Sequence, residues 1–226
     1  MRPAADAAPE GPATTQPAST TGAGRRVVVL HGLWMPRVSM RWHARQLRRA
    51  GFHPVVFGYA GVAGGPEAAM SGLRALLREP ADILAHSLGG LIAVRTLEQD
   101  PGLPVQRVVC LGSPLCGSAA ARGMARFGLG SISLGRAASL LREGCEPWRG
   151  PAQLGVVAGN LGLGLGRVFG HFQGGNDGTV AVDETRLPGE SDHIVLPTSH
   201  SGMLLSPDVS AQAIHFLAHG HFAHRR

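Results

Sequence analysis

One serine lies between an expected buried strand and an expected helix. It is Ser87, in Ala-His-Ser-Leu-Gly-Gly at 85–90, directly after an expected strand at 81–85. A tight strand–turn–helix lifts such a serine clear of the sheet and brings strand and helix so close that the residues two before and two after must be small. Ala85 and Gly89 meet that requirement, although Ala85 departs from the strict G-x-S-x-G pattern. The pattern predicts a nucleophile, and its plain alternative is a serine that caps a helix.

Candidates for a general base and an acid follow Ser87 in the order that this chemistry needs. The serine needs a base and the base needs an orienting carboxylate, and after such a turn the acid precedes the histidine in the chain. Asp177 lies among small residues in Gly-Gly-Asn-Asp-Gly at 174–178, which suits a loop tip. His200 lies in a loop just before the expected last helix. We therefore predict that Asp177 is the acid and His200 the base.

Each of these two assignments has weaker rivals. Asp183 and Asp192 are the other candidates for the acid, and a simple Asn-Asp-Gly turn is the plain alternative for Asp177. His193 is the rival base, but it falls inside an expected strand rather than in the loop that follows it.

A serine that attacks a carbonyl needs N–H donors aimed at the developing oxyanion. The first expected strand ends in His-Gly-Leu-Trp at 31–34, where a turn would point the N–H of Leu33 at Ser87. The N–H of Leu88, at the start of the following helix, is the second expected donor. His31 itself is expected to hold the loop by a hydrogen bond rather than to act as a base.

These residues need a parallel sheet to bring them together. Short β-branched runs alternate with segments of helical period, which indicates a parallel α/β sheet with helices on both faces. The expected strands lie at 26–31, 53–58, 81–85, 105–111, 153–158 and 192–196, and the expected helices at 36–50, from 66, at 87–99 and at 207–219.

The motifs HGLW, AHSLGG, GSPLCGS, GNDGTVAV and SHSGML, in this order, resemble the α/β-hydrolase superfamily, and within it small bacterial lipases and serine esterases. The resemblance covers residues 25–220. It implies a single-domain fold without a large cap domain. It also implies an ester hydrolase with Ser87 as nucleophile, Asp177 and His200 as acid and base, and Leu33 and Leu88 as oxyanion donors.

The same resemblance leaves the substrate and part of the chemistry open. Thioesterase or acyltransferase activity is compatible with these residues, and a non-catalytic binding protein on the same fold is the alternative of another class. We expect a small-molecule acyl ester as substrate, no cofactor and no metal. Apolar side chains are expected to surround the serine, namely Leu33, Trp34, Leu88, Leu115, Met203 and Leu204.

Three segments are expected to differ from the folded domain. Residues 1–24 are rich in Ala, Pro and Thr and predict a disordered tail, and residues 221–226 predict a frayed basic tail. Within 113–150, the glycine-rich stretch 117–135 predicts a mobile flap whose apolar side chains face the site or make transient contact with a lipid surface. An ordinary packed crossover is the alternative.

Charge and cysteine content exclude several classes. All 21 basic residues are Arg, so there is no Lys chemistry, and their scattered positions indicate solvated surface charge rather than nucleic-acid binding. Of three cysteines, Cys110 is expected to be buried, and Cys116 and Cys145 would pair only in an oxidising compartment. His215 and His219 suit a polar helix end better than a metal pair. No signal-peptide core and no transmembrane run is found, so a cytoplasmic location is expected.

Overall fold

One parallel sheet forms the centre of the molecule, as the buried β-branched runs predict. A computed structural model describes residues 24–33, 35–59, 65–118, 146–162 and 174–224. Within them six strands pair in parallel in the order β2-β1-β3-β4-β5-β6. The strands are β1 (Arg26–Leu30), β2 (His53–Phe57), β3 (Asp82–His86), β4 (Arg107–Leu111), β5 (Gln153–Gly159) and β6 (Asp192–Leu196). The expected α/β fold is confirmed.

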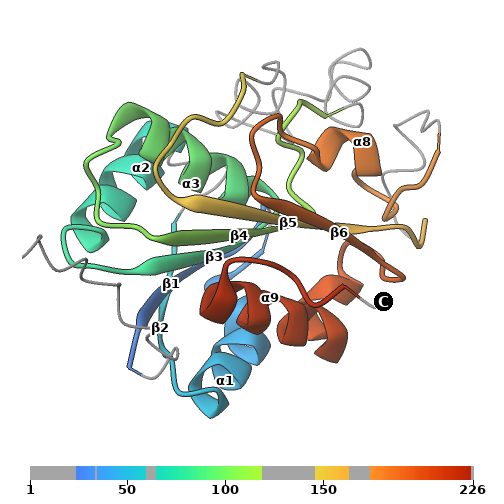
Figure 1. Ribbon diagram of the computed structural model, residues 1–226, viewed down its shortest axis with the longest axis horizontal. Helices are drawn as coiled ribbons and strands as arrows, with labels where there is room; N and C mark the ends of the chain where they lie inside the picture. The colour runs from blue at the N-terminus through green and yellow to red at the C-terminus, as the bar shows by residue number, and fades with distance from the viewer. Residues whose placement is uncertain (1–23, 34, 60–64, 119–145, 163–173, 225–226) are drawn as a thin grey trace, which may run out of the picture.

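Helices cover both faces of this sheet (Figure 1). One face carries α2 (Gly65–Leu76) and α3 (Leu88–Gln99), and the other carries α1 (Arg41–Arg49) and α9 (Pro207–His219). Three short helical segments complete the described part: the 3-10 turns η1 (Arg37–Met40) and η3 (Gly202–Leu205), and α8 (Val182–Thr185). The helix expected at 36–50 therefore begins as a 3-10 turn, after an extended Pro36.

The continuous apolar run of β1 reflects burial on both sides. Val28 and Leu30 belong to the core cluster under α2 and α3, whereas Val27 and Val29 belong to the cluster under α1 and α9. Because side chains alternate along a strand, a strand covered on both faces needs apolar residues at every position.

The strand register brings the candidate site loops to one edge of the sheet. Leu30 lies beside Ala85, and Ala85 lies beside Cys110, so β1, β3 and β4 end at the same level. Leu111 lies beside Val157 in β5, which continues that edge. The carboxyl ends of parallel strands are where ligands bind in open α/β sheets. The loops after β1, β3, β4, β5 and β6 therefore meet at one place.

The cysteines differ from the expectation in one respect. Cys110 is free and fully buried, as predicted. Cys116 is disulfide-bonded, and its backbone N–H donates to Glu184 O at 2.9 Å. Cys145 lies outside the described residues. From the sequence, such a bond is expected only in an oxidising compartment.

The chain after α9 is docked rather than frayed as far as His224. Phe222 is 1% exposed and packs on Phe216, with ring centroids 4.9 Å apart. The Phe222 N–H donates to an Asp192 carboxylate oxygen at 2.7 Å, and His224 bonds the same carboxylate. An aromatic side chain that the sequence placed in a tail thus extends the core under α9.

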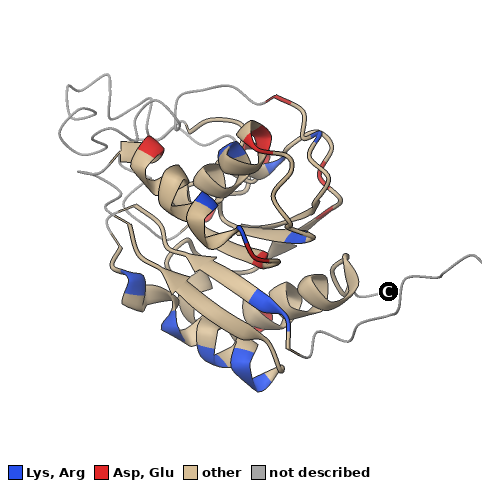
Figure 2. Ribbon diagram, turned by 90° about the vertical axis from the view of Figure 1, so that its left-hand side faces the viewer, with Lys and Arg blue, Asp and Glu red and all other residues tan. Residues whose placement is uncertain are grey.

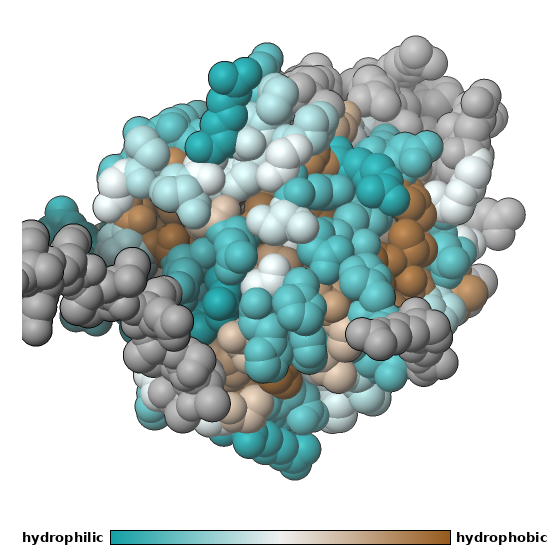
Figure 3. All heavy atoms as spheres, in the orientation of Figure 1, coloured by the Kyte–Doolittle hydropathy of each residue, from teal (hydrophilic) through white to brown (hydrophobic). Residues whose placement is uncertain are grey.

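The surface turned toward the viewer in Figure 3 is mostly hydrophilic, with apolar side chains in separate patches. Large exposed apolar residues of the described chain include Val38, Leu161, Val195 and Leu205. Among the described residues, no helix combines the length and the hydropathy that crossing a bilayer would need.

Candidate active site

Ser87 sits on a tight turn between β3 and α3. Its φ is 54° and its ψ −121°, and its backbone N–H donates to Leu111 O at 2.8 Å. A Cβ on Gly89 would stand 2.7 Å from His31 O, so only glycine lets α3 start this close to the end of β1. Although Ser87 occupies the N-cap position, its side chain makes no capping hydrogen bond. The hydroxyl is therefore available for another partner, unlike that of an ordinary helix cap.

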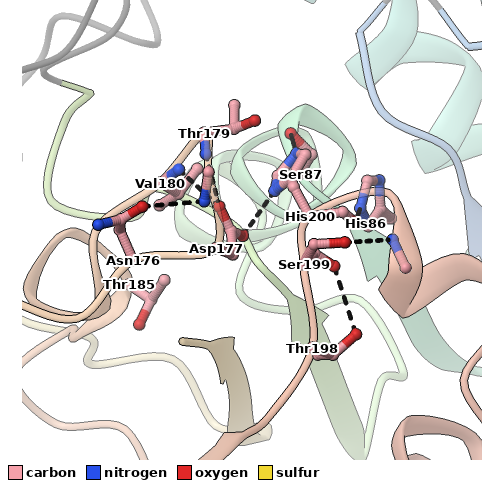
Figure 4. Close-up of polar contacts among 12 residues, drawn as sticks. His86, Ser87, Asn176, Asp177, Thr179, Val180, Thr185, Thr198, Ser199 and His200 are labelled. Atoms are coloured by element: carbon pink, nitrogen blue, oxygen red, sulfur yellow. Dashed lines mark hydrogen bonds and ion pairs between the residues drawn. The ribbon is translucent and has the colours of Figure 1, made fainter. Parts of the chain in front are cut away.

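That partner is His200. Its Nε2 lies 3.0 Å from Ser87 Oγ, and its Nδ1 lies 2.7 Å from Asp177 Oδ2 (Figure 4). The carboxylate can only accept, so Nδ1 carries the proton and Nε2 presents its lone pair to the serine hydroxyl. The structure thus brings the three predicted side chains into one hydrogen-bonded row, with His200 8% exposed and Asp177 1% exposed.

Asp177 is fixed by its own loop. Its Oδ1 accepts from the N–H groups of Thr179 and Val180 at 2.9 and 2.7 Å, which leaves Oδ2 for His200. Its backbone carbonyl also accepts from the His200 N–H at 2.8 Å. The loop after β5 and the loop after β6 are therefore joined by two bonds, one from the backbone and one from the side chain.

Gly112, at the end of β4, makes room for this pair, and the sequence analysis did not single it out. Its φ is +55°, and a Cβ there would stand 3.1 to 3.2 Å from Asp177 Oδ2, Met203 Sδ and His200 Nδ1. The signal in the sequence was the glycine of Gly-Ser-Pro-Leu directly after a strand, at the same edge as Ser87.

The predicted oxyanion loop lies against Ser87. A Cβ on Gly32 would stand 3.1 Å from Ser87 Cβ, so residues 31–33 run beside the serine. Neither Leu33 N–H nor Leu88 N–H has a hydrogen-bond partner within the described chain. Both expected donors thus remain without a partner in the two segments that adjoin Ser87, and Leu88 opens α3, where the helix dipole favours negative charge.

His31 supports this loop, as expected. Its Nδ1 bonds Gly32 O at 2.9 Å, and the Tyr59 hydroxyl donates to His31 O at 2.6 Å. The His31 and Tyr59 rings stack with centroids 4.3 Å apart. These contacts anchor the loop to the segment after β2.

His86 links the nucleophile strand to the base loop, and the sequence analysis passed over it. It is fully buried, its Nε2 lies 3.1 Å from His200 O, and its ring centroid is 4.7 Å from that of His200. Burial, and then the neighbouring His200, hold the pKa of His86 well below its ordinary value. His86 is therefore neutral, donates from Nε2 to the His200 carbonyl, and leaves its Nδ1 unpaired among the described residues.

The rival acids and base lie elsewhere. Asp183 is exposed on α8, and Asp192 bonds Phe222 and His224. His193 Nε2 lies 2.9 Å from Thr185 Oγ1, and burial lowers the pKa of His193 to about 4. Within the described structure none of these three bonds Ser87 or His200.

The residues predicted to line a substrate pocket divide between the two faces. Leu115 packs in the cluster under α2 and α3, with Leu33 against it. Met203 and Leu204 belong to the cluster under α1 and α9, and Met203 is fully buried behind the Asp177–His200 pair. Met203 therefore presents no surface to a substrate in this structure. Trp34 and residues 119–135 of the expected flap lie outside the described residues.

Only the comparison with solved structures finds proteins similar to this chain. No protein-family model matches the sequence, and no curated protein matches it. The mature form of the lipase BlEst2 from Bacillus licheniformis matches the structure with a TM-score of 0.67 and 20% identity, over 92% of this chain and 94% of that one. An extracellular α/β-hydrolase from a Paenibacillus species matches with a TM-score of 0.54 and 14% identity, over 86% and 98%.

A third solved structure matches in the same way. It is an α/β-hydrolase enzyme from the metagenome of lagoon sediments at Mar Chica, Morocco, with a TM-score of 0.57 and 18% identity, over 86% of this chain and 90% of that one. The chain described here therefore has the α/β-hydrolase fold and resembles bacterial lipases and esterases in structure.

Proposed function

We propose that the protein is a serine hydrolase of carboxylic esters. The observation that carries this proposal is the row of bonds from Ser87 Oγ to His200 Nε2 at 3.0 Å and from His200 Nδ1 to Asp177 Oδ2 at 2.7 Å. The strained turn at Ser87 and the two free N–H groups beside it add the nucleophile geometry and the oxyanion donors. Structural neighbours named as a lipase and as an esterase support the same reaction class.

In this mechanism Ser87 Oγ attacks the ester carbonyl carbon while His200 Nε2 takes the hydroxyl proton. Asp177 holds the proton of His200 on Nδ1 and stabilises the imidazolium that forms. The N–H groups of Leu33 and Leu88 stabilise the negative oxygen of the tetrahedral intermediate. His200 then gives its proton to the leaving alcohol, and an acyl group remains on Ser87. Water, deprotonated by His200, attacks the acyl carbon. The bond from this carbon to Ser87 Oγ then breaks, His200 returns the proton to Ser87, and the carboxylic acid leaves.

Positioning of the base is part of this proposal. His86 donates to the carbonyl of His200 from the strand that carries Ser87, so one strand fixes both the nucleophile and the base loop. Its lowered pKa keeps the His86 ring neutral, which avoids a second positive charge beside the imidazolium of the intermediate.

Hydrolysis of p-nitrophenyl esters of graded acyl length tests the function. Wild-type protein is expected to turn over at least one ester, and Ser87→Ala is expected to lose several orders of magnitude in kcat. Ser71→Ala, the same change at an exposed position of α2, is the matched control and should keep full activity.

Parallel assays separate the alternatives. A matching acyl thioester measures thioesterase activity, and an added alcohol acceptor measures acyl transfer in competition with water. If wild-type protein turns over none of these substrates and Ser71→Ala behaves identically, the chain is a binding protein on a hydrolase fold and the proposal is wrong.

A further inference from the structure

Seven of the 21 arginines lie in one segment that has no acidic residue. Between Glu10 and Glu67 the sequence has seven arginines and no Asp or Glu. Arg25 pairs with Asp82, and Arg26 lies near Glu79. The other five belong to η1 and α1, beside the edge strand β2: Arg37, Arg41, Arg45, Arg48 and Arg49. Five arginines with no acidic residue between them in the sequence therefore lie at one edge of the sheet.

Four of these arginines form one stripe, Arg37, Arg41, Arg45 and Arg48. Their spacing of four, four and three residues places them on one side of the helical segment, where they span about 17 Å. In Figure 2, basic positions follow one another along α1, with no acidic position on that helix. All four are exposed, and none has an ion-pair partner in the described part of the chain.

This stripe is unfavourable for the isolated chain. Like charges four residues apart on a helix destabilise it, and α1 has no acidic residue in its first turn to offset them. An anionic partner would remove that repulsion.

A groove of about 350 Å³ lies along the stripe, between α1 and β2. The four arginines line it together with Val38, Ala44 and Val56. Val38 is 45% exposed, so an aliphatic surface lies open between the charges. The groove thus combines phosphate-binding groups with aliphatic side chains, and none of its lining residues is aromatic.

We propose that this groove binds the phosphate headgroups of an anionic phospholipid bilayer. Guanidinium groups pair with phosphate in forked geometry, and arginines near an anionic membrane each add to the attraction. The aliphatic lining suits the glycerol and upper acyl region of a lipid, whereas single-stranded nucleic acid is held by stacking on aromatic side chains. The binding is independent of the ester hydrolysis proposed above.

The stripe also fixes how the molecule would lie on the bilayer. Arg37 packs against Gly58, which follows the carboxyl end of β2, since a Cβ on Gly58 would stand 3.1 Å from Arg37 Cδ. The stripe therefore starts at the edge of the sheet that carries Ser87 and runs away along α1. A membrane bound there would lie beside the loops of the candidate active site.

Co-sedimentation with lipid vesicles tests this site. The protein carries Ser87→Ala, so that hydrolysis cannot alter the vesicles and failure of the proposed function does not affect the result. The full-length protein is expected to sediment with vesicles of equal parts phosphatidylglycerol and phosphatidylcholine, but not with pure phosphatidylcholine. Added salt should release it, because exposed charges are screened.

The discriminating variant replaces Arg41, Arg45 and Arg48 with Gln, and we expect binding about a hundredfold weaker. Its matched control replaces three exposed arginines outside α1 with Gln, namely Arg78, Arg149 and Arg186, and should bind the vesicles as the parent protein does. Thermal unfolding verifies that both variants are folded, and Arg→Lys at the three α1 positions should restore most of the binding.

Equal loss of vesicle binding in the α1 variant and in the control variant would show that only the net charge of the protein matters, and would overturn the proposed site. If the parent protein does not bind anionic vesicles, or binds duplex DNA in their place, the membrane assignment is wrong.

Discussion

Ser87 has a positive φ, which no other non-glycine residue of the described chain has. Such a backbone costs on the order of 1–3 kcal/mol and persists only where the surroundings enforce it. Here the surroundings are the bond from Ser87 N–H to Leu111 O and the close approach of Gly89 to His31. The turn directs the hydroxyl toward His200 instead of into a helix cap. Strain at this residue is therefore tied to the chemistry that we propose for it.

Asp177→Asn should lower kcat by about 10⁴-fold with little effect on folding. The amide would donate to Nδ1 of His200 and leave the proton on Nε2, where the serine needs a lone pair. Steady-state hydrolysis of a p-nitrophenyl ester measures the loss. Asp183→Asn, at an exposed position of the neighbouring helix α8, serves as control. If Asp183→Asn is the damaging change and Asp177→Asn is not, the acid has been assigned to the wrong residue.

Some of the candidate site residues could be predicted from the sequence and others could not, for a physical reason. Ser87, Asp177 and His200 follow strands in the order that one chemistry requires, so local pattern and topology suffice to select them. His86 and Gly112 act through space, on groups that lie far from them in the chain. Nothing in the local pattern shows that a histidine ring will bond the carbonyl of another histidine, or that a glycine will face a carboxylate.

At the scale of the elements, the end of β4 controls how closely the loops after β5 and β6 approach. Gly112→Ala should lower kcat roughly tenfold to a hundredfold, because the new methyl group would press on Asp177 Oδ2 and His200 Nδ1. Gly174→Ala is the matched control: its φ of +93° is also positive, but no atom beyond its own chain neighbours lies within 4 Å of its Cβ position. Ester hydrolysis and thermal unfolding of both variants provide the comparison. Equal activity of the two variants would show that a methyl group at position 112 does not disturb Asp177 and His200.

The segment after β4 also carries the disulfide. The chain has three cysteines, of which Cys110 is free and Cys116 is bonded. Thiol titration of the denatured, unreduced protein should therefore find one thiol per chain, and three after reduction. Three thiols before reduction would contradict the bond, and two would place it between two chains.

The sequence predicted the strands well and the segment after α9 poorly. The six strands lie within one or two residues of their expected positions. Burial on both faces gives β1, β3, β4 and β5 a clear apolar run, whereas β2 and β6, at the edges of the sheet, are only partly buried. The expected frayed tail is wrong at residues 221–224, because the Phe222 ring packs on Phe216 and the Phe222 N–H donates to Asp192. Such docking depends on a pocket formed by α9 and β6 and has no local signature.

At the scale of the whole molecule, buried histidines should set the acid limit of stability. Burial lowers the pKa of His43 from 6.5 to about 4, and the pKa of His86 is also lowered. Between pH 6.5 and about pH 4, His43 binds a proton in the unfolded chain but not in the folded chain. The free energy of unfolding should therefore fall as the pH is lowered from 6.5 toward 4, by up to about 3 kcal/mol from His43.

Thermal unfolding across this pH range measures the effect. His43→Gln keeps a donor toward Met203 O but does not titrate, so its stability should fall less steeply. His53→Gln, at an exposed histidine of β2, is the control and should follow the wild-type curve. A wild-type curve that is flat over this range would contradict the neutral, buried state of His43.

The central claim is that Ser87 is an activated nucleophile. Reaction with a fluorophosphonate, followed by intact-mass measurement and peptide mapping, tests it most directly. We expect one phosphonate per folded chain, on the peptide that contains Ser87, with none on heat-denatured protein or on Ser87→Ala. Absence of label at Ser87 in the folded wild-type protein would contradict this assignment. Equal labelling of the wild-type protein and of Ser87→Ala would contradict it as well.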